Sequence, residues 1–176
     1  GCVRPETSLE SMSKLKPAFD KNGVVTAGTS SPLTDGAAAV IVCSENYAKT
    51  NNLKIMAYIR GMAISGCSPE IMGIGPVLSS QKALKRAGID LKDIDIIEMN
   101  EAFAAQSLAC VKELGIDMSK LNIHGGAIAM GHPLGASGAR ITGKAASLLQ
   151  ETGKKYALST MCVGGGQGCA TVLERA

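Results

Sequence analysis

Residues 125–140 read GGAIAMGHPLGASGAR, and the interpretation of the whole chain starts from this stretch. Its five glycines allow the backbone to approach another segment or a ligand where a side chain would collide. Pro133 disfavours helical backbone at His132, so we expect the imidazole on an extended loop ahead of a helix that begins near Ala136. The first N–H groups of a helix have no partner within it and attract anionic oxygen. The stretch suits oxyanion stabilisation in acyl transfer, although a tight strand-to-helix connection has the same pattern.

The composition fits one globular domain of ordinary size. The chain has 176 residues, of which 45% are hydrophobic, and it contains no tryptophan. Its net charge of +3 comes from interleaved basic and acidic residues. Since no basic stripe with aromatic platforms occurs, we expect no nucleic-acid partner. A mildly basic face still suits an anionic small molecule such as a nucleotide phosphate.

The six cysteines do not form a metal-binding pattern, because no C-x-x-C pair occurs and only two histidines are available. We therefore predict no metal site. Most of these cysteines lie in apolar runs, as buried thiols do in a reducing compartment. The predicted location is cytoplasmic for a bacterial chain, and mitochondrial or peroxisomal for a eukaryotic one. We interpret all of them except Cys162 as structural: Cys2, Cys43, Cys67, Cys110 and Cys169.

No secretory signal or membrane span is expected. The first 20 residues carry several charges, and no apolar run reaches the length of about 20 residues that crosses a bilayer. The chain begins with Gly rather than Met, which indicates processing or trimming. Residues 1–23 are polar and predict a helix or loop on the surface.

The hydrophobic patterns predict a layered α/β domain with a mixed sheet. The run AAAVIVC at 37–43 is interpreted as a buried strand, although its alanines also fit a buried helix. Pro76 and Gly88 mark the start and stop of one helix. The further predicted strands are 54–65, 94–100, 156–163 and 167–173, and the further predicted helices are 44–52, 102–114 and 136–152.

The stretch NEAFAAQ at 100–106 places Asn100 at the carboxyl end of a predicted strand, where α/β sheets bind ligands. Its amide can hold a water or a carbonyl oxygen. An N-cap of the following helix is the alternative, and the two roles are compatible. We expect Glu101 to favour the start of that helix electrostatically, and Phe103 taken alone fits a core position.

The stretch MCVGGGQG at 161–168 places Cys162 before three glycines. Bare backbone N–H groups beside a thiol favour the thiolate, and the Gly164 N–H can donate to a thioester oxygen. The alternative is a β-hairpin with a glycine-rich turn and an inert cysteine. His124 is interpreted as structural or exposed.

Two glycine-rich and proline-rich loops, 26–36 and 66–76, carry Ser31 and Met72. These side chains can line a tunnel for a flexible ligand, although each taken alone fits an ordinary loop or core position.

Together these stretches resemble, in order, the carboxyl-terminal half of a thiolase, an acyl-CoA acyltransferase. Five motifs carry the resemblance over nearly the whole chain: TAGTSSPLTDGAAA, PEIMGIGP, NEAFAAQ, GGAIAMGHPLGASGAR and CVGGGQG. The amino-acid sequences of these motifs are most similar to those of 3-ketoacyl-CoA thiolases of fatty-acid degradation. The implied fold is half of a five-layered αβαβα molecule. Residues 1–49 would end the amino-terminal half, and residues 50–176 would form the carboxyl-terminal domain.

The resemblance also implies roles for particular residues. His132 matches the histidine that activates the nucleophile and donates to a thioester oxygen, and Asn100 matches the residue that holds a water there. Cys162 matches the general acid/base, and Gly164 matches a backbone donor of a second oxyanion hole. Coenzyme A or acyl-CoA is implied as substrate, with no permanently bound cofactor. Its pocket would include Ser31, Met72, Ala102 and Phe103.

One departure concerns the nucleophile, a cysteine of the amino-terminal half that is followed by Ser or Ala and then Gly. No cysteine here has that context, since Cys67 precedes Ser-Pro and Cys43 precedes Ser-Glu. The chain is therefore expected to be inactive without that half, which becomes an implied partner. The alternative is a non-catalytic CoA-binding or assembly module. The resemblance also implies a homo-oligomer, and His124 stands where the family usually has Asn.

Overall fold

The computed structural model describes residues 3–176, so the expectation for Cys2 lies outside the described residues. Its centre is a four-stranded sheet in the order β1-β4-β3-β2. β1 (Ala57–Gly66) pairs antiparallel with β4 (Gln167–Arg175), and β4 pairs antiparallel with β3 (Tyr156–Val163). β2 (Ile96–Met99) runs parallel to β3. The predicted mixed sheet is confirmed.

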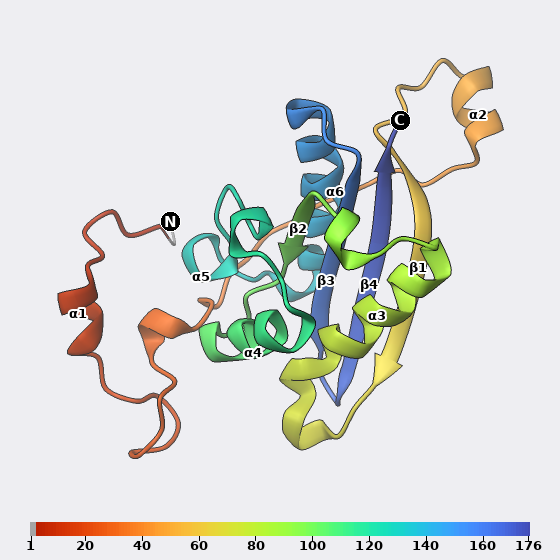
Figure 1. Cartoon of the computed structure of the whole chain (residues 1–176). Helices are drawn as coiled ribbons and strands as arrows, with labels where there is room; N and C mark the ends of the chain where they lie inside the picture. Colours follow the sequence, from red (N-terminus) through yellow and green to blue (C-terminus); the bar gives the residue numbers. More distant parts are fainter. Residues whose placement is uncertain (1–2) are drawn as a thin grey trace.

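Helices cover both faces of this sheet (Figure 1). α3 (Gly75–Ala87) lies on one face and α6 (Leu134–Thr152) lies on the other. The α3 side has a cluster of buried residues that includes Leu84, Ile97, Leu158 and Val172. The α6 side has a second cluster: Ile96, Ala145, Leu148, Leu149, Ala157 and Leu173. Successive residues of β2 and β3 alternate between these two cores, as side chains of a strand must.

Shorter elements connect and flank this body. α4 (Ala104–Leu114) packs beside α3, and α5 (Ala127–Met130) precedes α6. α1 (Leu9–Ser13) and α2 (Glu45–Thr50) lie away from the sheet in Figure 1. The short 3₁₀ helices are η1 (Ala27–Thr29), η2 (Pro69–Ile74, kinked at Ile71), η3 (Leu91–Asp93) and η4 (Met118–Lys120).

Local sequence signals explain the helix ends. Pro76 lies in the first turn of α3, and Gly88 ends that helix with a φ of +66°. Gly115 ends α4 in the same left-handed conformation, with a φ of +72°. Glycine adopts this backbone conformation without the steric cost that other residues have there.

α6 begins at Leu134, slightly before the expected start near Ala136. The Pro133 carbonyl accepts hydrogen bonds from the N–H groups of both Ala136 and Ser137, which closes the first turn early. The short helix α5 was not anticipated within the glycine-rich stretch.

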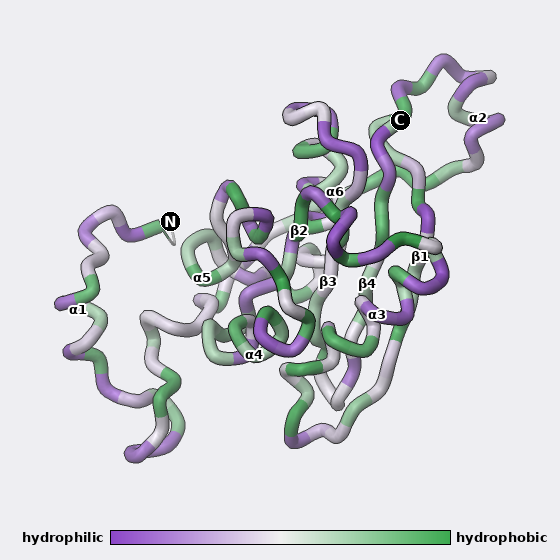
Figure 2. Tube along the Cα trace, viewed as in Figure 1, coloured by the Kyte–Doolittle hydropathy of each residue, from purple (hydrophilic) through white to green (hydrophobic). Residues whose placement is uncertain are grey.

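The predicted buried strand at 37–43 is wrong. These residues are extended but belong to neither a strand nor a helix, and all of them are exposed, Ile41 to 85%. Figure 2 shows this hydrophobic stretch leading to α2. A strand exists only where another strand supplies its hydrogen bonds, and no described residues supply them here.

Candidate active site

Asn100 and Cys162 lie at the carboxyl ends of two neighbouring parallel strands. Met99 of β2 is in register with Thr160 of β3, and the Asn100 N–H donates to the Thr160 carbonyl at 3.0 Å. Cys162 follows two residues further along β3. The sheet therefore brings Asn100 and Cys162 to the same end of its strands, although 62 positions separate them in the sequence.

The Asn100 side chain is fully buried, and neither its Oδ1 nor its Nδ2 has a hydrogen-bond partner among the described residues. Leaving a buried amide unpaired costs roughly 1–3 kcal/mol. The N-cap interpretation is wrong, because Phe103 holds the N-cap position of α4 and no side chain caps that helix. The amide is free for a ligand or a water.

Glu101 does not serve α4 either. Its Oε1 accepts from Asn122 Nδ2 at 2.7 Å, and its Oε2 accepts from the Ile128 N–H at 3.2 Å. Ile128 lies in the first turn of α5, so the carboxylate stabilises the start of α5 rather than α4. This contact anchors the glycine-rich stretch to the end of β2.

His132 has one ring nitrogen fixed and the other free. Its Nδ1 lies 2.6 Å from Ser137 Oγ, and Ser137 Oγ donates its only hydrogen to the Pro133 carbonyl at 3.0 Å. The hydroxyl oxygen must therefore accept from Nδ1–H, which leaves the lone pair of the neutral imidazole on Nε2. Partial burial, with a smaller effect from the Arg140 charge, lowers the pKa of His132 from 6.5. The ring is a neutral base with Nε2 available.

Helix α6 directs His132 toward the end of β3 at which Cys162 lies. Thr142 Oγ1 is 3.1 Å from Ser159 Oγ, and a Cβ atom added at Gly138 would lie 3.8 Å from Met161 Sδ. Earlier residues of α6 thus face later residues of β3. His132 immediately precedes this helix, as expected on a non-helical segment.

The loop after η1 packs against the same segment. A Cβ atom at Gly36 would lie 2.8 Å from Pro133 Cγ, and one at Gly131 would collide with Thr34. The glycines therefore permit a close approach of two backbone segments beside His132.

Cys162 is 6% exposed, and its burial raises the pKa of the thiol. The expectation of a thiolate is wrong for this chain, since the cost of burying a negative charge exceeds the effect of the backbone donor. The expected hairpin is present, with residues 164–166 forming the turn between β3 and β4. A Cβ atom at Gly164 would meet nothing within 4 Å, so the space on that side of its Cα atom is open.

Three of the four predicted substrate-binding residues lie together. The N–H and Oγ of Ser31 donate to the Ala102 carbonyl at 3.0 and 3.1 Å. Phe103 pairs as a β-bridge with Ser30, and its ring meets that of Phe19 edge to face. Met72 lies on η2, and within the described residues no hydrogen bond links it to the other three. η2 instead contacts α4, where Cys110 Sγ donates to the Gly73 carbonyl at 3.3 Å.

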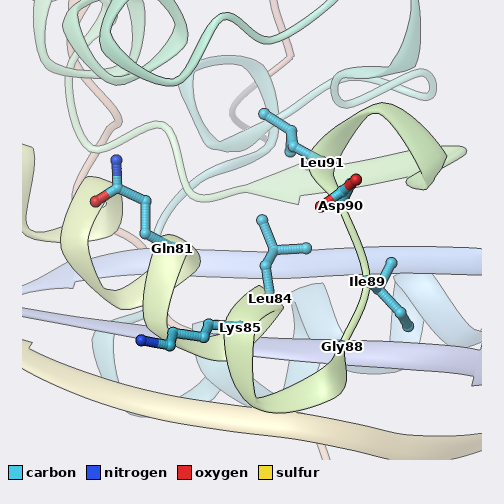
Figure 3. A pocket seen from close by; sticks show the side chains of 7 residues that line it. All are labelled: Gln81, Leu84, Lys85, Gly88, Ile89, Asp90 and Leu91. Atoms are coloured by element: carbon cyan, nitrogen blue, oxygen red, sulfur yellow. The ribbon is translucent and has the colours of Figure 1, made fainter.

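Two surface hollows lie away from these residues. Figure 3 shows one of about 350 Å³ at the carboxyl end of α3, lined by Gln81, Leu84, Lys85, Gly88, Ile89, Asp90 and Leu91. A second, of about 460 Å³, adjoins the end of α4. Neither includes a predicted site residue. Among residues 3–176, no group of three His, Cys, Asp or Glu side chains could hold a metal ion, and no helix is long and apolar enough to cross a membrane.

Comparison with known families identifies the chain. The family model for the C-terminal domain of thiolase matches residues 53–175, and the model for the N-terminal domain matches residues 2–46. The chain belongs to the thiolase family. The sequence did not single out Ser137, whose hydroxyl lies 2.6 Å from His132 Nδ1. A hydroxyl in the first turn of a helix that follows a histidine was the available signal for Ser137.

Individual thiolases agree with the family models. The 3-ketoacyl-CoA thiolase of Vibrio parahaemolyticus is 58% identical over 98% of this chain, which covers 45% of that protein. The crystal structure of human mitochondrial 3-ketoacyl-CoA thiolase superposes with a TM-score of 0.98 at 51% identity, over 100% of this chain and 45% of that one. The human enzyme in complex with CoA gives a TM-score of 0.94 at 49% identity, with the same coverage. The chain thus spans about half the length of the relatives it matches.

Proposed function

We propose that this chain is the carboxyl-terminal part of a 3-ketoacyl-CoA thiolase, and that it acts when the amino-terminal part supplies the nucleophilic cysteine. The observation that carries the proposal is the buried, unpaired amide of Asn100 after β2, at the same end of the sheet as Cys162 and at the end toward which α6 directs a neutral His132. An unpaired amide destabilises an ordinary core, whereas in an active site it can bind the groups that stabilise a developing oxyanion.

In the first half-reaction, His132 Nε2 takes the proton of the nucleophilic thiol. The sulfur forms a bond to the 3-keto carbon of the substrate, and the bond between carbons 2 and 3 breaks. Its electron pair passes to the α-carbon of acetyl-CoA, where Cys162 supplies a proton. A buried thiol whose pKa is raised suits this acid role, because it is protonated when the enolate forms.

In the second half-reaction, the Cys162 thiolate takes the proton of an incoming CoA thiol. The CoA sulfur then attacks the acyl-cysteine and releases the shortened acyl-CoA and the free nucleophile. The covalent intermediate divides one difficult step into two easier ones.

Two donor sets stabilise the oxyanions in this scheme. Asn100 holds a water that donates, with His132, to one thioester oxygen, and the Gly164 N–H donates to the other. The open space beside Gly164 and the unpaired Asn100 amide support these roles. The pantetheine arm lies against Ser31, Met72, Ala102 and Phe103, and CoA is a substrate rather than a resident cofactor.

The amino-terminal part covers the apolar surface of this chain. Residues 1–49 complete that part, and 37–43 pair there as a strand. Met62 and Ile64, on the same face of edge strand β1, are 56% and 69% exposed, and neighbouring exposed apolar side chains of this kind support an interface there. We also expect a homo-oligomer, and the bacterial relatives support a cytoplasmic location.

The test is thiolysis of acetoacetyl-CoA by a fusion enzyme. In it, the part of Vibrio parahaemolyticus thiolase outside the matched 45% is joined ahead of this chain. We expect turnover by the fusion enzyme and none by this chain alone. Acyl-CoA binding by calorimetry without turnover, from a folded fusion enzyme, would instead indicate a non-catalytic CoA-binding module.

A further inference from the structure

A buried polar cluster lies directly behind the proposed site. Six buried side-chain nitrogen and oxygen atoms lack a hydrogen-bond partner among residues 3–176, and five of them belong to three residues. These atoms are Oδ1 and Nδ2 of Asn100, Oε1 of Glu98, and Nε and Nη2 of Arg140. The sixth is the hydroxyl of Ser80, on α3. Orphaned buried atoms are rare in native proteins, so a concentration of them marks a place where partners are supplied from elsewhere.

The fold puts the three residues on one face of the sheet. Ile96 packs in the α6 core, so alternation along β2 directs Glu98 and then Asn100 toward α6 as well. Glu98 is in register with Ser159, whose hydroxyl meets Thr142 of α6. Arg140 belongs to α6, the helix that covers this face of the sheet, and its charge acts on Glu98.

The charge of Arg140 acts on two titratable groups at the proposed site. Burial raises the pKa of the Glu98 carboxyl to about 7, and the charges of Lys144 and then of Arg140 oppose this effect. The Arg140 charge also acts on His132, where it adds to burial in lowering the pKa of the imidazole. One guanidinium is therefore within electrostatic reach of both β2 and the segment ahead of α6.

The other charged groups nearby already have partners. Glu101 accepts from Asn122 and Ile128, and Lys144 Nζ lies 2.8 Å from Nδ1 of His124. Glu98 and Arg140 do not form an ion pair within 4.0 Å, since none joins them among the described residues. Ordered water can bridge buried polar groups that lie beyond hydrogen-bond distance of each other.

We propose that Glu98 and Arg140 are positioning residues of the thiolase site, joined to each other and to Asn100 through ordered water. The inference rests on the proposed function. It adds a buried network between β2 and α6 that holds the Asn100 amide and the His132 ring in position. Neither residue touches substrate.

The test uses Arg140→Met, Arg140→Lys, Glu98→Gln and the double variant Glu98→Gln/Arg140→Met in the fusion enzyme. We expect Arg140→Met and Glu98→Gln each to lower kcat about tenfold or more, with KM for acetoacetyl-CoA changed less than about twofold, because the pair acts on the position of catalytic groups. Arg140→Lys keeps the charge and loses the planar fork, so it should recover part of the rate. Arg86→Met, on α3 at the other face of the sheet, is the matched control and should leave kcat unchanged.

A second readout does not need turnover. In this chain alone, the imidazole of His132 is titrated by NMR in the wild type, Arg140→Met and Arg140→Lys. We expect the titration midpoint to rise in Arg140→Met and to stay near wild type in Arg140→Lys. If the wild-type fusion enzyme has no activity, the proposed function fails while this titration still tests the network.

Two results would overturn the inference. One is an unchanged kcat in both Glu98→Gln and Arg140→Met. The other is a lower melting temperature with neither kcat nor the His132 titration affected, which is the signature of a structural pair. Where Arg140→Met does not fold, Arg140→Lys and the double variant decide the outcome, because both avoid leaving Glu98 as an unpaired buried charge.

Discussion

The Nδ1 atom of His132 lies 2.6 Å from the hydroxyl oxygen of Ser137, five residues later in the first turns of α6. Since that hydroxyl gives its hydrogen to the Pro133 carbonyl, Ser137 fixes which imidazole nitrogen carries the proton. A base that works through Nε2 depends on this choice of tautomer as much as on its pKa.

Replacing Ser137 with alanine should therefore lower kcat of the fusion enzyme. We expect a loss of about tenfold to a hundredfold, less than the loss for the base itself, because the ring remains but its tautomer and orientation are no longer fixed. Steady-state thiolysis of acetoacetyl-CoA measures the effect. The control is Ser80→Ala, which removes another fully buried hydroxyl, one without a partner and remote from the site. Equal rates in the two variants would contradict the role of Ser137.

The His132 imidazole should titrate below 6.5 in this chain, because partial burial and Arg140 disfavour its charged form. A folded state that binds fewer protons than the unfolded state gains stability as pH rises through the window between the lowered value and 6.5. Below that window the contribution of this group is lost. NMR of the imidazole measures the midpoint, and a His124→Gln variant assigns the two histidines. A midpoint above 6.5 would contradict the described environment.

Glu98 predicts the opposite pH dependence. Burial raises the pKa of its carboxyl from 4.5 to about 7, so the folded state binds more protons than the unfolded state between these values. Stability contributed by the protonated form is present below pH 4.5 and is lost as pH rises to about 7. The cost above that pH is about 3 kcal/mol, at about 1.4 kcal/mol per pH unit.

Glu98→Gln should remove this cost. Denaturant unfolding of the two proteins should show the variant more stable above pH 7 and equal to the wild type near pH 4.5. A variant that is less stable at every pH would mean that the ionised carboxylate is well paired. A gain in stability with a loss of kcat is the pattern expected when a strained polar group serves function.

Cys162 should resist alkylation near neutral pH. It is 6% exposed and its pKa is raised by burial, whereas Cys43 is exposed. With limiting iodoacetamide and peptide mass spectrometry, we expect Cys43 to be labelled much faster near pH 7, because only an accessible thiolate reacts. Labelling of Cys162 at the rate of Cys43 would show that it is a thiolate in this chain and unsuited to the proposed acid role.

The helix ends that proline and glycine set could be predicted from the sequence. Pro76, Gly88 and Gly115 set helix ends through their own backbone preferences, and these need no knowledge of neighbours. The two carboxyl-terminal strands followed from their apolar runs around a glycine-rich turn.

The sequence could not show that residues 37–43 form no strand in this chain. An apolar run becomes a strand only beside a partner strand, and the run itself does not show whether that partner is present. Only the position of Asn100, and not its hydrogen bonding, could be predicted from the sequence. Its place after β2 followed from the apolar run, but its loss of the N-cap role depends on three residues that intervene before α4.

The network behind the site was hidden for a different reason. The run IDIIEMN at 94–100 predicts a strand of near-continuous apolar character, and nothing in this pattern distinguishes Glu98, one of its two acidic residues, as part of a site. The charge that acts on it belongs to Arg140, 42 positions later, and only the packing of α6 on β2 brings that charge within electrostatic reach.

The measurement that tests the thiolase assignment most directly is the exchange of the methyl protons of acetyl-CoA with deuterium from solvent. The fusion enzyme should incorporate deuterium at that carbon. Cys162→Ala should remove the proton carrier, and His132→Ala should remove a donor to the enolate oxygen, so each should slow exchange by about a hundredfold or more. Exchange at the wild-type rate in both variants would contradict the account.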